Sequence, residues 1–189
     1  MHLHAAAATA WVALLVVQAA LVVGGRLRVH QRLGAAGLAV AAGFAPLTLL
    51  AVRAFLTRSD PPGALEQTVF FPQVASLAMF AAFVGAGALL RRRPEAHARL
   101  MLLATVALLG TPVARIELFG IRDHPLAVVA LWDLPAVLLL AHDVAFRRRL
   151  HPATAAGLGV LLALQGVSVA LMGNAAWGAV VSEIAARVR

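Results

Sequence analysis

Four histidines that recur beside arginine-rich stretches are the residues of this sequence best suited to hold a cofactor: His30, His97, His142 and His151. Neutral imidazole ligates transition metals and binds haem iron axially, and haem needs only two histidines that face one another across a bundle. No His-x-x-x-His spacing occurs in the chain, so a site would have to be assembled between separate segments. The pattern favours a haem b or metal site built from these histidines.

A second group of ionisable residues includes His2 and His4, a His-x-His pair at the start of the first apolar segment. Two closely spaced imidazoles are a candidate metal site. Arg115 and Asp133 lie at similar depth in two later apolar segments. A charge in such a segment is costly unless it is paired or solvated. We therefore predict a structural ion pair between Arg115 and Asp133, and we prefer it to a catalytic carboxylate.

The elements that must position these residues are six long apolar segments. Hydrophobic residues make up 62% of the 189 residues, against about 45–50% in an ordinary soluble domain, and a soluble fold of this size could not bury the excess. A membrane-spanning helix needs about 20 mostly apolar residues. We predict an all-α fold, a polytopic membrane helix bundle that forms one domain over residues 1–189. Its six transmembrane helices cover residues 5–23, 33–56, 69–90, 100–118, 126–146 and 152–172, and a short interfacial helix covers residues 175–188.

The arginines predict the orientation of these helices. Most of them lie in the first, third and fifth loops, at residues 26–32, 91–99 and 147–149. Because arginine-rich loops stay in the cytoplasm, we expect these loops inside and both termini outside. This topology also supplies an alternative for the four histidines. Each imidazole would lie in the lipid head-group zone and help neighbouring arginines meet lipid phosphate.

Several classes of function are excluded or lack support. Cysteine is absent, which excludes disulfides, iron–sulfur clusters and thiolate zinc, and the lack of lysine excludes a Schiff base. The formal net charge of +8 comes from the loop arginines, so membrane topology explains it and we exclude nucleic-acid binding. No nucleophile elbow, phosphate loop or His-Glu-x-x-His motif is present. The sequence therefore predicts no enzyme class.

The three arginine-rich loops resemble one another, because each has an arginine cluster, then a histidine, then the start of the next apolar segment. They occupy residues 26–33, 91–100 and 147–154. The simplest interpretation is three helix hairpins in parallel orientation, related by an axis along the membrane normal. The alternative is that cytoplasmic loops converge on this composition without any repeat.

Four motifs spread over nearly the whole chain: His2-Leu-His4, His30-Gln-Arg-Leu-Gly34, His97-Ala-Arg-Leu-Met101 and Arg149-Leu-His151-Pro-Ala-Thr154. With them the sequence resembles a family of uncharacterised bacterial multi-spanning proteins of the inner (cytoplasmic) membrane. Members usually carry glycine where Ala5 stands and often have a further apolar segment upstream. The resemblance implies a multi-pass inner-membrane protein, with both termini periplasmic in the orientation above, and no assigned activity. More distantly, the sequence is similar to transmembrane b-type cytochromes, whose histidine ligands lie deeper in their helices.

Three functions remain open after this reasoning. The first is a haem- or metal-binding membrane redox protein that uses the four histidines. The second is a small transporter or proton-linked carrier that uses Asp133 and Arg115. The third is a non-catalytic membrane subunit or assembly factor. The expected partners are the lipid bilayer and either another membrane protein or a second copy of the chain.

Overall fold

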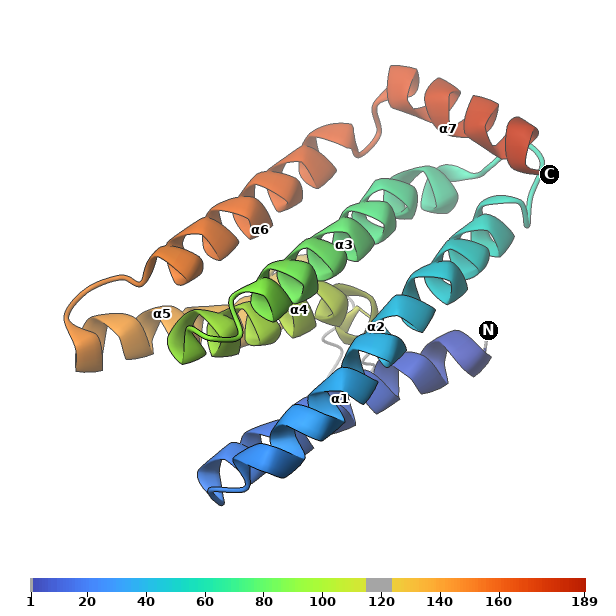
Figure 1. Cartoon of the computed structure of the whole chain (residues 1–189). Coiled ribbons are helices and arrows are strands. Elements are labelled where there is room, and N and C mark those ends of the chain that lie inside the picture. Colours follow the sequence, from blue (N-terminus) through green and yellow to red (C-terminus); the bar gives the residue numbers. More distant parts are fainter. Residues whose placement is uncertain (1, 115–123) are drawn as a thin grey trace. The chain divides into compact units, whose positions relative to one another are not determined.

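The computed structural model describes residues 2–114 and 124–189, and over these residues the chain forms seven helices and no strand (Figure 1). The helices are α1 (His2–Val23), α2 (Leu27–Leu56), α3 (Ala64–Leu89), α4 (Pro94–Val113), α5 (Pro125–Arg147), α6 (Pro152–Leu171) and α7 (Ala175–Val188). The predicted all-α class is therefore confirmed.

Helices α1 to α6 are long and apolar enough to cross a membrane, by length and composition. Many of their large apolar side chains are exposed, including Val23 at 90% and Leu126 at 86%. Water would penalise such surfaces, whereas hydrocarbon covers them at no cost. The chain is an integral membrane protein whose helices contact the lipid bilayer.

Several helices begin earlier than the hydropathy predicted. Helix α3 begins at Ala64 rather than at residue 69, and α4 begins at Pro94 rather than at residue 100. Hydropathy finds only the apolar part of a helix, whereas the hydrogen-bonded turns continue into its polar end. Proline at the first helical position favours such a start, because its missing N–H would have no helical acceptor there. The early start of α4 places Arg99 inside a helix, where the sequence had suggested a loop.

The other end of α4 also differs from the prediction. The helix ends at Val113, with Ala114 as its C-cap, whereas the sequence predicted helix up to residue 118. The last four predicted positions, residues 115–118, lie outside the described residues.

The chain forms two compact units, which we describe separately. Unit 1 contains Met1–Ala75 and Gln165–Arg189, and unit 2 contains Ser76–Leu164. In unit 1, α1 and α2 run antiparallel and side by side (Figure 1). Gly37 of α2 permits this approach, because a Cβ atom there would lie 2.7 Å from a methyl carbon of Leu14. Small residues at such crossings are typical of membrane helix pairs.

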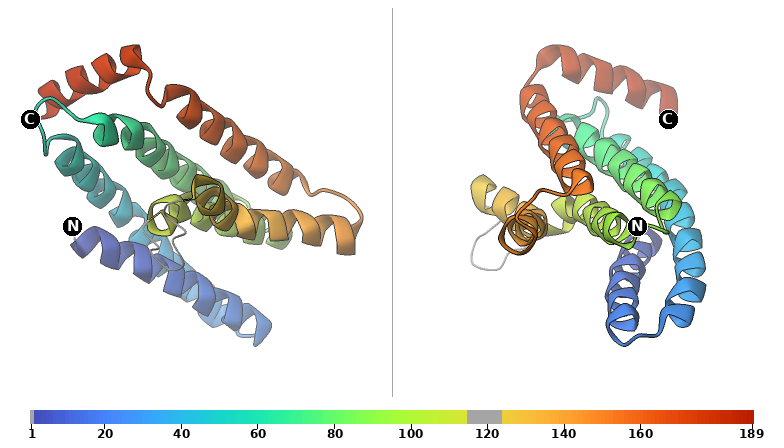
Figure 2. Two further views of the ribbon diagram at one scale, coloured as in Figure 1. Left: turned by 180° about the vertical axis from the view of Figure 1, so that it is seen from behind. Right: turned by 60° about the vertical axis from the view of Figure 1, so that its left-hand side comes forward.

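The end of unit 1 is closed by α7. The chain turns sharply between α6 and α7 (Figure 2), at Gly173, whose φ of +69° favours glycine. The Asn174 side chain then caps α7 by accepting a hydrogen bond from the backbone N–H of Trp177. The apolar face of α7 buries Val181 and Ala185 against Leu56 at the end of α2. A helix over residues 175–188 is confirmed, and its place at the membrane interface stays a prediction.

Unit 2 contains the second part of α3, with α4, α5 and most of α6. Helices α4 and α5 lie side by side (Figure 2), and the Trp132 indole N–H donates to the Val106 carbonyl at 2.8 Å. Gly157 of α6 packs directly against the buried side chain of Leu103 on α4. The buried face of α4 therefore meets both following helices, which positions the polar residues at its N-terminal end.

Candidate functional site

The strongest cluster of chemistry-bearing residues in unit 2 centres on Asp143, in the last turn and a half of α5. Local conformation explains how three helices reach it. Helix α5 ends at Arg147, and its C-cap Arg148 has a left-handed backbone (φ 50°) that reverses the chain after the last turn. Helix α6 then begins at Pro152 and carries Thr154 in its first turn. Arg99 comes from the second turn of α4.

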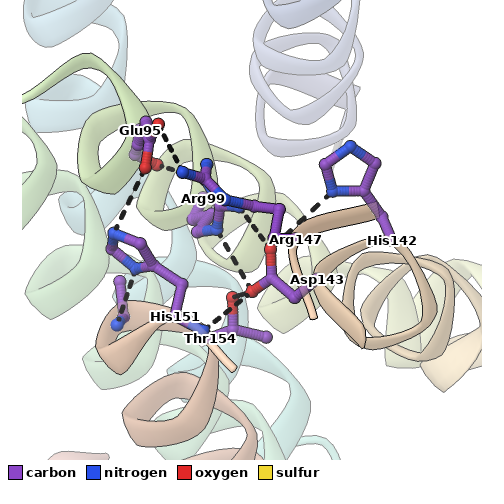
Figure 3. Close-up of polar contacts among 8 residues, drawn as sticks. Glu95, Arg99, His142, Asp143, Arg147, His151 and Thr154 are labelled. Carbon is purple, nitrogen blue, oxygen red and sulfur yellow. Dashed lines mark hydrogen bonds and ion pairs between the residues drawn. The ribbon is translucent and has the colours of Figure 1, made fainter. Parts of the chain in front are cut away.

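The Asp143 carboxylate is fully buried and accepts hydrogen bonds from three directions (Figure 3). Arg99 binds both carboxylate oxygens, through its Nη2 atom and, at 3.3 Å, through its Nε atom. The hydroxyl of Thr154 donates to Oδ2 at 2.6 Å, and the backbone N–H of His151 donates to the same oxygen at 3.1 Å. Arg99 is itself only 6% exposed. The ion pair therefore lies out of contact with solvent, and it ties α4, α5 and the start of α6 together.

A second layer surrounds this pair. Arg147 donates to Glu95 at 2.6 Å, and Arg99 donates through Nη1 to the Glu95 backbone carbonyl at 3.0 Å. The His151 ring lies beside Glu95: its Nε2 is 4.0 Å from Glu95, and its Nδ1 accepts from the Ala153 backbone N–H at 3.1 Å. We call the whole set the ionic network; it comprises Glu95, Arg99, His142, Asp143, Arg147, His151 and Thr154 (Figure 3).

This geometry has a clear chemical consequence. A buried carboxylate is tolerated only when its charge is paired and its oxygens are hydrogen-bonded, and here both conditions hold. A carboxylate that is paired with Arg99 and already accepts hydrogen bonds from Thr154 and the His151 amide is poorly placed to take a proton from a substrate. Asp143 and Arg99 thus act as a clamp between helices, whereas Glu95 and His151 at the edge of the ionic network remain accessible.

A pocket of about 680 Å³ lies at that edge, and we call it the α4–α6 pocket. Its apolar walls come from the end of α3, the start of α4 and the start of α6. Glu95 and His151 belong both to its lining and to the ionic network, and Arg93 is the third charged or titratable residue that lines it. Figure 3 shows Glu95 and His151 pointing toward one another. The full lining is Ala86, Leu90, Arg93, Pro94, Glu95, Ala96, Leu100, His151, Pro152, Ala153 and Ala156.

The four histidines predicted to hold a cofactor are divided between the two units. His30 is in α2 of unit 1, whereas His97, His142 and His151 are in unit 2. His142 is 55% exposed, with Nδ1 3.7 Å from Asp143, and its ring lies 5.4 Å from that of Phe146. Among the side chains that the structure describes, no group of three or more histidine, aspartate or glutamate residues is arranged to hold a metal ion.

His97 has the most informative geometry of the four. Its Nδ1 lies 2.9 Å from the carbonyl oxygen of Gly87. A carbonyl oxygen can only accept, so Nδ1 carries the proton, and a neutral ring then has its lone pair on Nε2. A backbone carbonyl that fixes the tautomer in this way is the usual support for a metal-ligating histidine.

Of the second group of ionisable residues, the structure describes the side chain of His4. The ring of His4 stacks on Phe44 at 5.0 Å, and its Nδ1 lies 3.3 Å from the Thr48 hydroxyl, so it links α1 to α2. The side chain of His2 and the whole of Arg115 lie outside the described residues. The predicted metal site at His2 and His4 and the predicted Arg115–Asp133 pair therefore stay predictions.

Sequence reasoning missed Arg99, Glu95 and Thr154 as parts of a site. Arg99 was grouped with the loop arginines, because it follows Arg93 closely. The signal that could have corrected this is Pro94, since a proline at the first helical position would place Arg99 in the second turn of a helix. No comparable signal marks the partners, because Arg99 and Asp143 are 44 residues apart.

Comparison with known proteins adds no assignment, since no protein-family model, no curated protein and no solved structure matches this chain.

Proposed function

We propose that this protein binds a small amphiphilic molecule within the membrane, in the manner of a carrier or binding protein, through the α4–α6 pocket. The observation that carries the proposal is the pocket itself, about 680 Å³ with mostly apolar walls and a charged edge. Pockets of about 300–1,000 Å³ with a few polar groups among apolar walls are typical of small-molecule sites. The ionic network supports one side of the pocket, and both of its carboxylates, Glu95 and Asp143, are paired with arginines, which favours binding.

Binding can be tested by filling the pocket. Ala156 lines it and is exposed, whereas its neighbour Ala155 is also exposed and is not among the lining residues. We expect Ala156→Phe to weaken binding of a fluorescent single-chain zwitterionic amphiphile to the detergent-purified protein at least several-fold, because the new ring occupies the cavity. The matched variant Ala155→Phe should bind as the wild type does. Equal affinity in all three proteins would contradict the proposal.

A second candidate function, haem-based electron transfer, is favoured by the His97–Gly87 hydrogen bond. In this proposal His97 and either His142 or His151, all residues of unit 2, would hold haem b. The bound haem would supply one-electron transfer, and the protein would orient the His97 ring through Gly87. Protein purified from haem-replete cells should show a Soret band that is lost in His97→Ala. A colourless preparation without bound metal would rule out this candidate.

We also infer that the protein resides in a bacterial inner membrane with its arginine-rich ends in the cytoplasm. The support is the arginine distribution, which places residues 91–93 and 147–149 on one side. Alkaline phosphatase fused after Pro62 should be active, because that loop would reach the periplasm. The same reporter fused after Arg148 should be inactive, and the reverse pattern would overturn the orientation.

A further inference from the structure

The stretches of chain that adjoin the α4–α6 pocket carry an excess of positive charge. The adjoining stretches, residues 76–99 and 140–156, contain seven arginines but only two acids, Glu95 and Asp143. Both acids are already paired, Glu95 with Arg147 and Asp143 with Arg99. The remaining five arginines at this end have no acidic partner within the two stretches, and Arg93 is the one of them that lines the pocket.

The walls of the same pocket are apolar. Leu90 and Leu100 line it, together with alanines from α3, α4 and α6. A free inorganic anion would gain nothing from such walls, whereas a hydrocarbon chain would gain by close packing against them. The small alanine side chains leave the groove that a chain would fill. The pocket therefore combines a cationic edge with a wall suited to an acyl chain.

Two helices also begin at the pocket, α4 at Pro94 and α6 at Pro152. The N-terminal end of a helix carries a partial positive charge, which adds to the field of Arg93. This contribution is secondary, because the backbone N–H of Ala153 in the first turn of α6 already donates a hydrogen bond to the His151 ring. The guanidinium of Arg93 and the apolar walls are the main features.

From this combination we propose that the ligand of the α4–α6 pocket is an anionic phospholipid from the surrounding leaflet. Its phosphate lies at Arg93 and His151, and the upper part of one acyl chain lies along Leu90, Leu100 and Ala156. This assignment rests on the proposed function and specifies its ligand. Arginine clusters at the cytoplasmic ends of membrane helices are suited to anionic head groups, because guanidinium pairs strongly with phosphate.

The test compares two phospholipids with identical chains, an anionic phosphatidylglycerol and a zwitterionic phosphatidylcholine. Each is titrated into the detergent-purified full-length protein, and the bound fraction is read by native mass spectrometry. We expect phosphatidylglycerol to bind roughly fivefold more tightly, the effect of about one arginine near a lipid head group. Arg93→Gln should remove this preference. Arg92→Gln, which changes an exposed arginine of the same cluster outside the lining, should keep it.

The outcomes separate this inference from the proposed function. If both lipids bind equally to the wild type and Ala156→Phe weakens the binding of both, ligand binding in the pocket is supported. The proposal that the ligand is an anionic phospholipid is then contradicted. If Ala156→Phe weakens binding of neither lipid, and Ala86→Leu on the α3 wall also weakens neither, the proposed function fails. Inorganic phosphate or glycerol 3-phosphate that displaces phosphatidylglycerol at equal concentration would identify a soluble anion and overturn the lipid assignment. Circular dichroism and thermal melting of each variant exclude misfolding as the cause.

Discussion

The two units of this protein are held together by different physical means. Unit 1 closes over an apolar cluster in which Val181 and Ala185 of α7 meet Leu56 of α2. Unit 2 is joined by the buried Arg99–Asp143 pair, which links helices that the sequence separates widely. Apolar contacts tolerate small shifts of one helix along another, whereas a bidentate ion pair fixes both distance and orientation. The pocket with a defined edge therefore lies in unit 2, which has the buried ion pair.

Polar contacts in unit 1 lie mainly at its surface. Arg53 donates to the backbone carbonyls of Val188, at 2.5 Å, and Arg189, at 3.1 Å, and the Arg189 side chain pairs with Asp60. The buried Glu66 is an exception, but its partner Arg58 is only eight residues away. Surface ion pairs contribute little because water and salt screen them. We therefore expect charge changes to matter most in unit 2.

The largest effect is expected from Asp143→Asn. It leaves the Arg99 guanidinium buried without its counter-charge, which costs about 3–5 kcal/mol of unfolding free energy. Unfolding is followed by fluorescence in a background where Trp132, a unit 2 residue, is the sole tryptophan. The double variant Arg99→Met with Asp143→Leu should recover most of the loss, since no charge is then left unpaired. A single variant as stable as the wild type would show that the pair does not hold unit 2.

The matching change in unit 1 is Leu56→Ala. It opens a cavity beside Val181 and Ala185, and we expect a loss of about 2–5 kcal/mol. Trp177 contacts the same cluster and reports the change when it is the sole tryptophan. Leu50→Ala is the control, because that side chain is 61% exposed on the same helix and should be nearly neutral. Equal losses in both variants would contradict an apolar closure of unit 1.

Glycine-to-alanine changes in α6 test its packing on α4, and we expect a smaller effect on the stability of unit 2. A Cβ atom at Gly157 would clash with the buried Leu103, whereas one at Gly159 would meet nothing within 4 Å. We expect Gly157→Ala to destabilise by about 1–3 kcal/mol through overpacking. Gly159→Ala should be neutral or stabilise by up to about 1 kcal/mol, because alanine favours helix. Thermal melting followed through Trp132 compares the two variants, and a reversed order would refute the packing.

The smallest effect is expected at the surface of unit 1. The hydrogen bond from Arg189 holds the pKa of the Asp60 carboxyl below its usual value of about 3.9. A carboxylate whose pKa is lowered by folding stabilises above its unfolded pKa, and this contribution is lost as the pH falls through the folded-state pKa. Asp60→Asn should therefore lower the melting temperature slightly near neutral pH. The difference from wild type should vanish in strong acid and shrink in high salt, and a difference that persists in acid would contradict the ion pair.

The sequence predicted the helices well because the requirement for a membrane span is local. A run of about 20 apolar residues can be recognised without reference to the rest of the chain, and each of the six predicted spans overlaps a helix long enough to cross a membrane. The polar ends of the helices were placed less well. Residues such as Pro94 and Arg99 reduce hydropathy although the helix includes them, which is why Arg99 was expected in a loop.

What the sequence determined by itself is that this chain is a bundle of membrane helices with arginine concentrated in alternate loops. Those properties follow from composition and order alone. Only the tertiary structure decided that Arg99, Asp143 and Thr154 meet, that Glu95 and His151 border a pocket with Arg93, and that the four histidines are divided between two units. The physical reason is that an ion pair or a cavity wall between helices depends on how the helices pack. Neither residue type nor spacing along the chain predicts which helix faces pack against one another.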